Sequence, residues 1–274
     1  MFASFLTTVL FSVSALCAHR SAKLIGGTEA NFWRISVATF FLAIWAYGFG
    51  KGLSGAALPI FLLSGVVGIG FGDVAYFQAL PRLGPRLSLL LVQCLTAPIG
   101  AIIEWLWLGA SLTPWQILFG VVVLAGVAIA LAPEEHLHIS PREWTLGILA
   151  GSLAALGQAG GAVLSRKAYE VVRAHGEHID GINAGFQRVV GGLVLAGICL
   201  AVVKRRERRL ELFGAEPELQ RRAAFWIVLN SLAGQTLGVS CMQWALETTK
   251  TGIVLPIIAT APIVVIPLAW LIDG

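Results

Sequence analysis

Four charged side chains lie inside segments that are otherwise apolar: Arg34, Asp73, Glu104 and Arg188. A charge in the hydrocarbon of a bilayer costs at least about 2.5–3.5 kcal/mol, so it persists where it pairs, faces a cavity or reaches the interface. Asp73 is the deepest of the four, and Tyr76 follows at i+3 on the same helical face. This pattern predicts a cation or proton site at Asp73. The alternative is a buried partner for an arginine or a hydroxyl.

Arg34 and Arg188 each lie two residues after a phenylalanine, near the start of an apolar segment. A guanidinium suits capture of an anionic or carboxylate group, so both are predicted to act at the mouths of a central path. Alternatively, both extend to the lipid headgroups. Glu104 adjoins Trp105 and precedes Trp107, and tryptophans are typical of the membrane interface, which favours a structural or hydrogen-bonding role for this carboxylate.

Uncharged polar residues inside the apolar segments are predicted to line the same path: Gln158, Asn230 and Gln235. Such side chains also serve as hydrogen-bonding contacts between helices, which is the alternative. Pro98 and Pro262 occupy equivalent places in two segments. They are predicted to break their helices and free backbone carbonyls, whereas the competing interpretation is a packing kink.

The composition excludes a soluble domain, because 57% of the 274 residues are hydrophobic and only 12% are charged. Four isolated cysteines without CxxC spacing indicate neither a metal site nor disulfides, and no cofactor is expected. The fold class is an all-α polytopic membrane protein. Nine stretches approach the length that crosses a bilayer, at about 2–19, 30–49, 57–79, 87–108, 114–132, 144–165, 182–203, 223–245 and 251–272.

The chain is built twice. The tetrapeptide Thr96–Ile99 recurs as Thr260–Ile263, and its neighbours repeat with it. The first repeat is predicted to span 1–132 with helices 1–5, residues 133–143 form a polar linker, and the second repeat spans 144–274 with helices 6–9. An odd number of helices per repeat inverts the second half relative to the first. The sequence thus predicts nine transmembrane helices of an expected ten, with the second repeat truncated before helix 10.

Basic residues outside the helices set the expected orientation. Seven of the 19 Lys and Arg residues lie between Lys204 and Arg222. The positive-inside rule places this loop in the cytoplasm and the N-terminus outside. A basic loop of this kind indicates membrane topology or contact with lipid headgroups, so no nucleic-acid partner is expected.

In these features the chain resembles the EamA-like family of the drug/metabolite transporter superfamily. The matching features are the tandem repeat, an arginine opening the second helix of each repeat, and a fourth helix that carries a proline and ends in Glu104–Leu108. The run 118–127 follows in the same pattern. The second copy departs from the family pattern, since Ala269 stands where the first has Glu104.

The resemblance implies a secondary transporter in the cell inner membrane that exports or exchanges a small organic metabolite by alternating access. Protons bound at Asp73 are the expected coupling ion, and no enzymatic activity is expected. Small residues at i and i+4 bring helices together within one chain or between two, so a homodimer is a further expectation. Two alternatives stay open: a truncated non-transporting or accessory membrane protein, and a membrane-embedded enzyme acting on a lipid-linked substrate.

Overall fold

The structure is a computed structural model, and it describes residues 1–131, 140–205, 212 and 216–273. Every regular element in these ranges is helical, so the all-helical prediction is confirmed. In chain order the elements are α1 (Phe2–Ile25), α2 (Gly27–Gly48), α3 (Leu58–Gly65), η1 (Val66–Phe71), α4 (Gly72–Leu108), α5 (Pro114–Leu131), α6 (Pro141–Ala174), α7 (Gly181–Lys204), α9 (Pro217–Asn230), η2 (Ser231–Gly238), α10 (Val239–Thr248), α11 (Thr251–Ile258) and α12 (Ala261–Asp273).

Seven helical spans among the described residues are long and apolar enough to cross a bilayer. A shorter apolar stretch in α5 and the helix α2 account for the other two predicted crossings. Two crossings combine several elements: Leu58–Gly84 runs through α3, η1 and the start of α4, and Pro217–Thr248 runs through α9, η2 and α10. The described chain is therefore helical at each predicted crossing.

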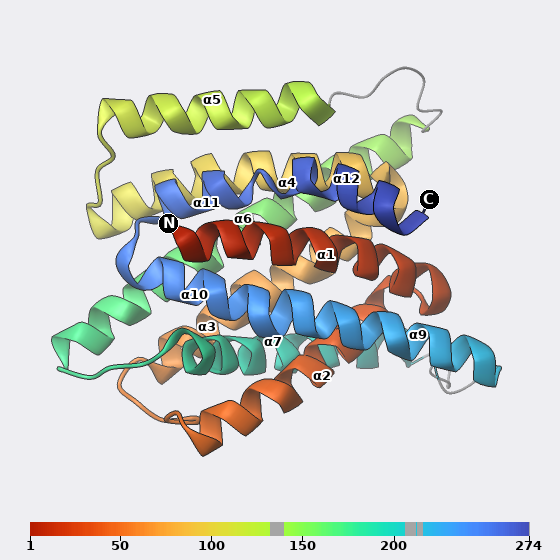
Figure 1. Ribbon diagram of the computed structural model, residues 1–274, viewed down its shortest axis with the longest axis horizontal. Coiled ribbons are helices and arrows are strands. Elements are labelled where there is room, and N and C mark those ends of the chain that lie inside the picture. The colour runs from red at the N-terminus through yellow and green to blue at the C-terminus, as the bar shows by residue number, and fades with distance from the viewer. Residues whose placement is uncertain (132–139, 206–211, 213–215, 274) are drawn as a thin grey trace.

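The two halves pack reciprocally. α6, the first helix of the second half, packs along α4 and contacts α3 and η1 of the first half, while α1 packs against α9, η2 and α10. Figure 1 shows α1 running from left to right and α6 from right to left, so corresponding helices point in opposite directions, and it shows α5 at the edge of the bundle. The interface between the halves thus passes through the middle of the bundle.

Glycines bring the two halves into backbone contact. A Cβ built on Gly161 of α6 would lie 2.6 Å from the Cα of Gly68 in η1. A Cβ built on Gly157 would lie 2.8 Å from the Cα of Gly72, at the start of α4. These two i,i+4 glycine pairs therefore meet each other within one chain, which fixes the level at which η1 crosses α6.

The helices η1 and η2 are π-helical segments at corresponding places in the two halves. η1 spans Val66–Phe71 in the third crossing, and η2 spans Ser231–Gly238 in the eighth. A π-helical turn is rare, widens the helix locally and is frequent at functional sites. Each of these segments lies against the first helix of the other half, so the two irregular turns face the interface between halves.

The crossings in α4 are separated by a glycine rather than by a proline. The backbone leaves the helical region at Gly84, whose φ of 76° is in the left-handed region that favours glycine. At Pro98 the backbone stays helical, so the break predicted there is absent. Proline removes one N–H from the helix, and here the packed helix accommodates that loss without an interruption.

The second half differs from the first at the equivalent proline. α11 ends at Ile258 and α12 begins at Ala261, so the helix is interrupted immediately before Pro262. The predicted linker 133–143 lies largely outside the described residues. Its last part is already helical, because α6 begins at Pro141 and is capped by the Ser140 hydroxyl, which accepts from the Glu143 amide at 3.3 Å.

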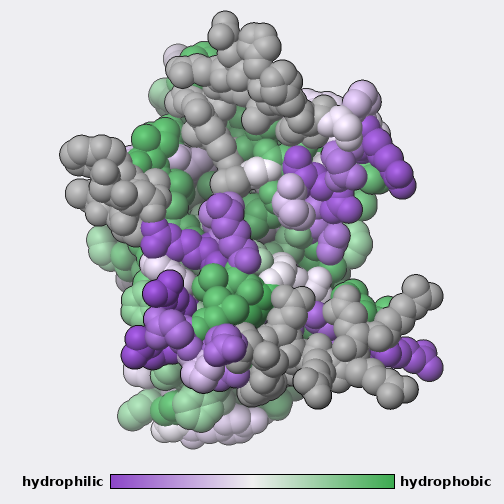
Figure 2. All heavy atoms as spheres, turned by 90° about the vertical axis from the view of Figure 1, so that its right-hand side faces the viewer, coloured by the Kyte–Doolittle hydropathy of each residue, from purple (hydrophilic) through white to green (hydrophobic). Residues whose placement is uncertain are grey.

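The helix ends gather at two opposite faces. The basic end carries most of the exposed cationic residues, and in Figure 2, which looks onto it, hydrophilic side chains flank a hydrophobic area. Its described residues are 20–27, 81–86, 140–144, 204–205 and 216–222. The far end is made of residues 48–57, 108–114, 174–181 and 248–251.

Candidate functional site

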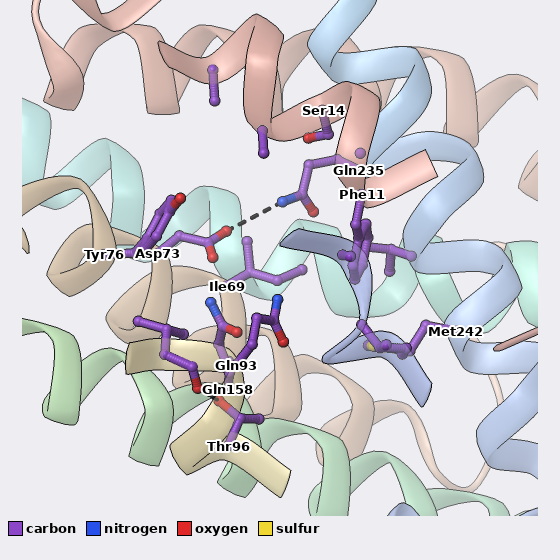
Figure 3. A pocket seen from close by; sticks show the side chains of 18 of the residues that line it. Phe11, Ser14, Ile69, Asp73, Tyr76, Gln93, Thr96, Gln158, Gln235 and Met242 are labelled. Carbon is purple, nitrogen blue, oxygen red and sulfur yellow. Dashed lines mark hydrogen bonds between the residues drawn. The ribbon is translucent and has the colours of Figure 1, made fainter. Parts of the chain in front are cut away.

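A polar cavity of about 120 Å³ lies between the two halves in the middle of the bundle. Residues of α1, α2, η1 and α4 of the first half and of α6, α7, η2, α10, α11 and α12 of the second line it, and Figure 3 shows several of them converging. The structure places here six of the residues predicted to line a path: Arg34, Asp73, Tyr76, Gln158, Arg188 and Gln235. A substrate in this cavity would touch both halves at once.

Asp73 is the only carboxylate among the described cavity residues, and two neighbours bond its Oδ2. The Arg34 Nη2 donates to its Oδ2 at 2.6 Å, and the Gln235 Nε2 donates to the same oxygen at 3.2 Å (Figure 3 shows the second bond). Arg34 is held on its other side by the Asn31 Oδ1, 2.9 Å from its Nε. In the structure Asp73 is therefore the buried partner of an arginine, which was the alternative interpretation.

Arg188 lies in the same cavity without an acidic partner. It is 3% exposed, its Nη1 is 3.4 Å from the Ser165 hydroxyl, and its Nε has no hydrogen-bond partner. Among the described residues no carboxylate pairs with it. Neither arginine extends to the headgroups, because both are buried beside the cavity.

The two arginines occupy equivalent backbone positions. The carbonyl of Arg34 accepts a hydrogen bond from the Ser231 hydroxyl at 2.8 Å. The carbonyl of Arg188 lies against Gly65, where an added Cβ would come within 1.7 Å of its oxygen. Gly65 and Ser231 are equivalent positions of the repeat. Each arginine's carbonyl therefore contacts the same position of the opposite half, as the duplication predicts.

Carboxamide and aromatic side chains complete the cavity wall. Gln93 and Gln158 line it beside Tyr76, and the Oε1 of Gln235 is buried without a hydrogen-bond partner. Figure 3 shows these carboxamides grouped near Asp73. Together they offer donors and acceptors that the protein leaves available to a ligand.

Asn230 does not line the cavity. Its Oδ1 accepts from the Ser14 hydroxyl of α1 at 2.7 Å, and the residue is completely buried. The bond joins α1 of the first half to α9 of the second. The structure therefore places Asn230 in the alternative role, a hydrogen-bonding contact between helices.

Glu104 lies in a buried ion-pair cluster toward the far end. It is 1% exposed, and the Arg166 Nε is 3.1 Å from its Oε1. Its Oε2 accepts from both the amide, at 2.8 Å, and the hydroxyl of Thr251. Arg166 also donates to the Leu246 carbonyl at 2.8 Å. The cluster ties α4 of the first half to α6, α10 and α11 of the second.

The loop between α2 and α3 is fastened to the start of α7 at the far end. The Asn183 Oδ1 accepts from the amides of Lys51 and Gly52, both at 2.9 Å. The Gln187 Nε2 donates to the carbonyls of Gly52 and Ser54, both at 2.9 Å. We call residues 49–57 the far-end loop. It belongs to the first half and is held by the second.

An exposed ion pair adds to this attachment. The Lys51 Nζ is 2.8 Å from the Glu177 Oε2, and the Ala56 amide donates to the Glu177 Oε1 at 3.2 Å. The hydrogen bond from Lys51, followed by that from Ala56, holds the pKa of Glu177 below its usual value. This contribution is present at neutral pH and is lost as the pH falls through the lowered pKa.

The basic end has its own contacts between halves. Lys204 of α7 lies 3.9 Å from Glu29 of α2, and Arg82 of α4 lies 3.2 Å from Glu143 of α6. Charged pairs thus join the halves at both ends of the cavity. Among the described residues no group of three His, Cys, Asp or Glu side chains is arranged to hold a metal ion.

Several residues of the site escaped the sequence-based interpretation. Arg166 was missed because the sixth crossing was expected to end at 165, whereas α6 continues to Ala174. Gln93 carries no periodic signal apart from being polar in an apolar stretch. Asn183 and Gln187 lie at i and i+4 at the start of α7, a spacing that puts both on one face and that could have indicated a shared partner.

Comparison with known proteins gives a family and a fold. The model of the EamA-like transporter family matches residues 1–132 and 145–274. No curated protein matches the chain. A solved structure, titled only as the crystal structure of a protein, is similar with a TM-score of 0.72 and 17% identity. That match covers 100% of this chain and 90% of the other.

Proposed function

Because the chain belongs to the EamA-like transporter family, whose model matches both of its halves, we propose that it exports or exchanges a small organic metabolite by alternating access. The family is one of membrane transporters in the drug/metabolite superfamily, and the chain is a multi-pass membrane protein.

The observation that carries the proposal is the polar cavity between the halves. Three ionisable side chains, Arg34, Asp73 and Arg188, are buried there inside an apolar bundle. Burying charges in a membrane protein is expensive, so such groups mark substrate or ion pathways. Transporters with inverted repeats bind their substrates between the repeats at mid-depth, which is where this cavity lies.

The contacts at the two ends suit alternating access. The Glu104 cluster and the far-end loop join the halves on one side of the cavity, and the pairs at Glu29 and Arg82 join them on the other. Opening either end requires that its contacts break while those of the opposite end hold. The π-helical turns η1 and η2 lie between the ends, where irregular backbone permits the halves to move against each other.

Proton coupling is assigned to Asp73. A proton on this carboxylate would remove its charge and release Arg34, which is 2.6 Å away. Arg34 lies on α2 and Asp73 on α4, so release changes the contact between two helices that line the cavity. Occupancy by a proton and by substrate would then favour different arrangements of the same side chains.

The setting of the protein in the cell is part of the proposal. We place it in the inner membrane with the basic end in the cytoplasm, because clustered Lys and Arg residues are retained on that side. A homodimer is compatible with the exposed apolar faces of α5, although the glycine pairs of α6 are already used within the chain. We assign no catalytic role, because the charged cavity residues are placed where they can bind a ligand between the halves.

Reconstitution tests the proposal. The purified full-length chain would be incorporated into liposomes and compared with empty liposomes for exchange of labelled metabolites, chosen from those whose cellular levels change when the gene is deleted or overexpressed. The proposal predicts saturable exchange that competing unlabelled metabolite slows. Exchange no faster than in empty liposomes, for every metabolite so identified, would instead favour a non-transporting membrane protein.

A further inference from the structure

We propose that the substrate carries a carboxylate and that Arg188 is the residue that holds it, an inference that rests on the proposed transport function. The starting observation is an asymmetry between the two halves. Both repeats supply an arginine to the cavity, at Arg34 and Arg188, but among the residues that the structure describes only the first repeat supplies an acid.

The asymmetry can be located at one position of the repeat. The glycines Gly68 and Gly72 of the first half correspond to Gly234 and Gly238 of the second, so the residue after each pair is also equivalent. In the first half that residue is Asp73. In the second half it is valine, at position 239, which is 3% exposed and lines the cavity without a charge.

Arg34 already has a carboxylate partner. Its Nη2 is bonded to Asp73 and its Nε to Asn31, while its guanidinium carbon lies 5.2 Å from the centre of the Phe77 ring. Arg188 is in the opposite situation. Its Nε is buried without a partner, and its one hydrogen bond, to the Ser165 hydroxyl, is long at 3.4 Å.

The charge of the cavity leads to the ligand class. Two arginines and one aspartate leave one positive charge without a counterion in a buried space. Such a charge is unfavourable until an anion enters, and the planar fork of a guanidinium matches a carboxylate through two parallel bonds. A cationic substrate would add to the imbalance, and Asp73, the acid that would accept it, is already bonded to Arg34 and Gln235.

The other residues of the cavity indicate which groups the substrate carries besides its carboxylate. The carboxamides of Gln93, Gln158 and Gln235 can bond hydroxyl or carbonyl groups, and Gln235 has a free acceptor. Ile69 and Met242 provide an apolar side, and Figure 3 shows both near the carboxamides. The cavity therefore fits a small organic acid with at least one further hydrogen-bonding group and a short hydrocarbon part.

Three probes of similar size separate the charge states: lactate, its neutral amide lactamide, and the cation formed by 1-aminopropan-2-ol. Binding of each to the purified full-length chain would be measured by calorimetry. We expect lactate to bind at least about tenfold more tightly than either analogue, which corresponds to 1.4 kcal/mol or more. Arg188→Gln should remove this preference, and Arg188→Lys should keep it with weaker binding, because an ammonium lacks the bidentate fork.

Arg173→Gln is the matched control. Arg173 lies on the exposed far end of α6, where it donates to the Glu247 carbonyl, and its replacement should leave lactate binding unchanged. The inference is overturned if lactate shows no preference over lactamide, or if the preference survives in Arg188→Gln. If Arg188→Gln does not fold, Arg188→Lys decides alone, since unchanged lactate affinity there contradicts a guanidinium anchor.

The same probes separate this inference from the transport proposal. Labelled lactate would be followed into liposomes that contain the chain. Lactate preference in binding, with no exchange of lactate or of any of the identified metabolites, would support the Arg188 site and contradict transport. Exchange of lactamide or the amine at rates equal to lactate would support transport and contradict the Arg188 site.

Discussion

The Nη2 of Arg34 lies 2.6 Å from the Oδ2 of Asp73, and the two side chains are only 7% and 12% exposed. The pair joins the second crossing of the first half to the third, in the wall of the cavity. A ligand or proton that neutralises Asp73 would leave a buried guanidinium without its partner. The pair is therefore a direct physical link between what occupies the cavity and how its helices pack.

Asp73→Asn is expected to leave membrane insertion intact and to abolish proton-coupled transport, because an amide does not bind a proton in this range. The variant should also be less stable, by about 3–5 kcal/mol, since Arg34 would remain buried and unpaired. Substrate-dependent proton movement, followed with a pH-sensitive dye inside liposomes, is the measurement. Unchanged proton-coupled transport would show that Asp73 is not the coupling residue.

The double variant Arg34→Gln with Asp73→Asn separates stability from function. Two neutral carboxamides can bond each other, so most of the lost stability should return in thermal unfolding. Transport should not return, because neither the proton site nor the charge is restored. Recovery of transport together with stability would show that the pair is needed only for folding.

Gly161→Ala should destabilise the contact between the halves. The added methyl would lie 2.6 Å from the Cα of Gly68, where no side chain can move aside, and overpacking of this kind costs about 1–3 kcal/mol. Gly160→Ala is the matched control, because its methyl would meet only the Val67 Cγ1 at 3.4 Å. Thermal unfolding in detergent should separate the two variants, and equal stability would contradict the backbone contact.

Glu104→Gln should loosen the far end. Removing the charge leaves Arg166 buried without a carboxylate, and we expect a loss of about 3–5 kcal/mol. Glu170→Gln is the control on α6, since its pair with Lys167 is more than one third exposed and contributes less than about 1 kcal/mol. If the two variants unfold at the same temperature, the Glu104 cluster does not stabilise the contact between the halves.

Acid should loosen the far-end loop, although its bonds to Asn183 and Gln187 do not depend on pH. Its contact with Glu177 is complete above the usual pKa of 4.5 and is lost as the pH falls through the lowered value. A spin label on Leu53→Cys, in a cysteine-free background, should be ordered at about pH 7 and become more mobile only below about pH 4.5. Glu177→Gln should raise the mobility of the label at neutral pH. If neither low pH nor Glu177→Gln changes the mobility of the label, Glu177 does not help to hold the far-end loop.

Much of the fold could be predicted because a membrane imposes a length and a polarity on each crossing. The repeated Thr96–Ile99 tetrapeptide located the duplication, and the odd helix count implied its inversion. The position of each break was harder. Pro98 stays in a helix while Gly84 makes the turn, because packing decides whether a proline interrupts a membrane helix, whereas a left-handed φ selects glycine directly.

The candidate site was predictable by residue type but not by pairing. Buried charge singled out Arg34, Asp73 and Arg188, and all three line the cavity. Which arginine pairs with the acid depends on the rotation of η1 and η2, and π-helical turns leave no periodic signal in a sequence. Asn230 was placed on the path because polarity alone does not say which face of a helix meets a neighbour.

Two-sided access to the cavity tests alternating access most directly, and it requires no knowledge of the substrate. In a background with the four cysteines replaced, Gln93→Cys would be exposed to a membrane-impermeant maleimide in right-side-out and in inverted vesicles. Ala38→Cys, which is buried away from the cavity, serves as the unreactive control. Alternating access predicts that position 93 is labelled from both sides and position 38 from neither. Labelling of position 93 from one side only, under every gradient applied, would contradict the account.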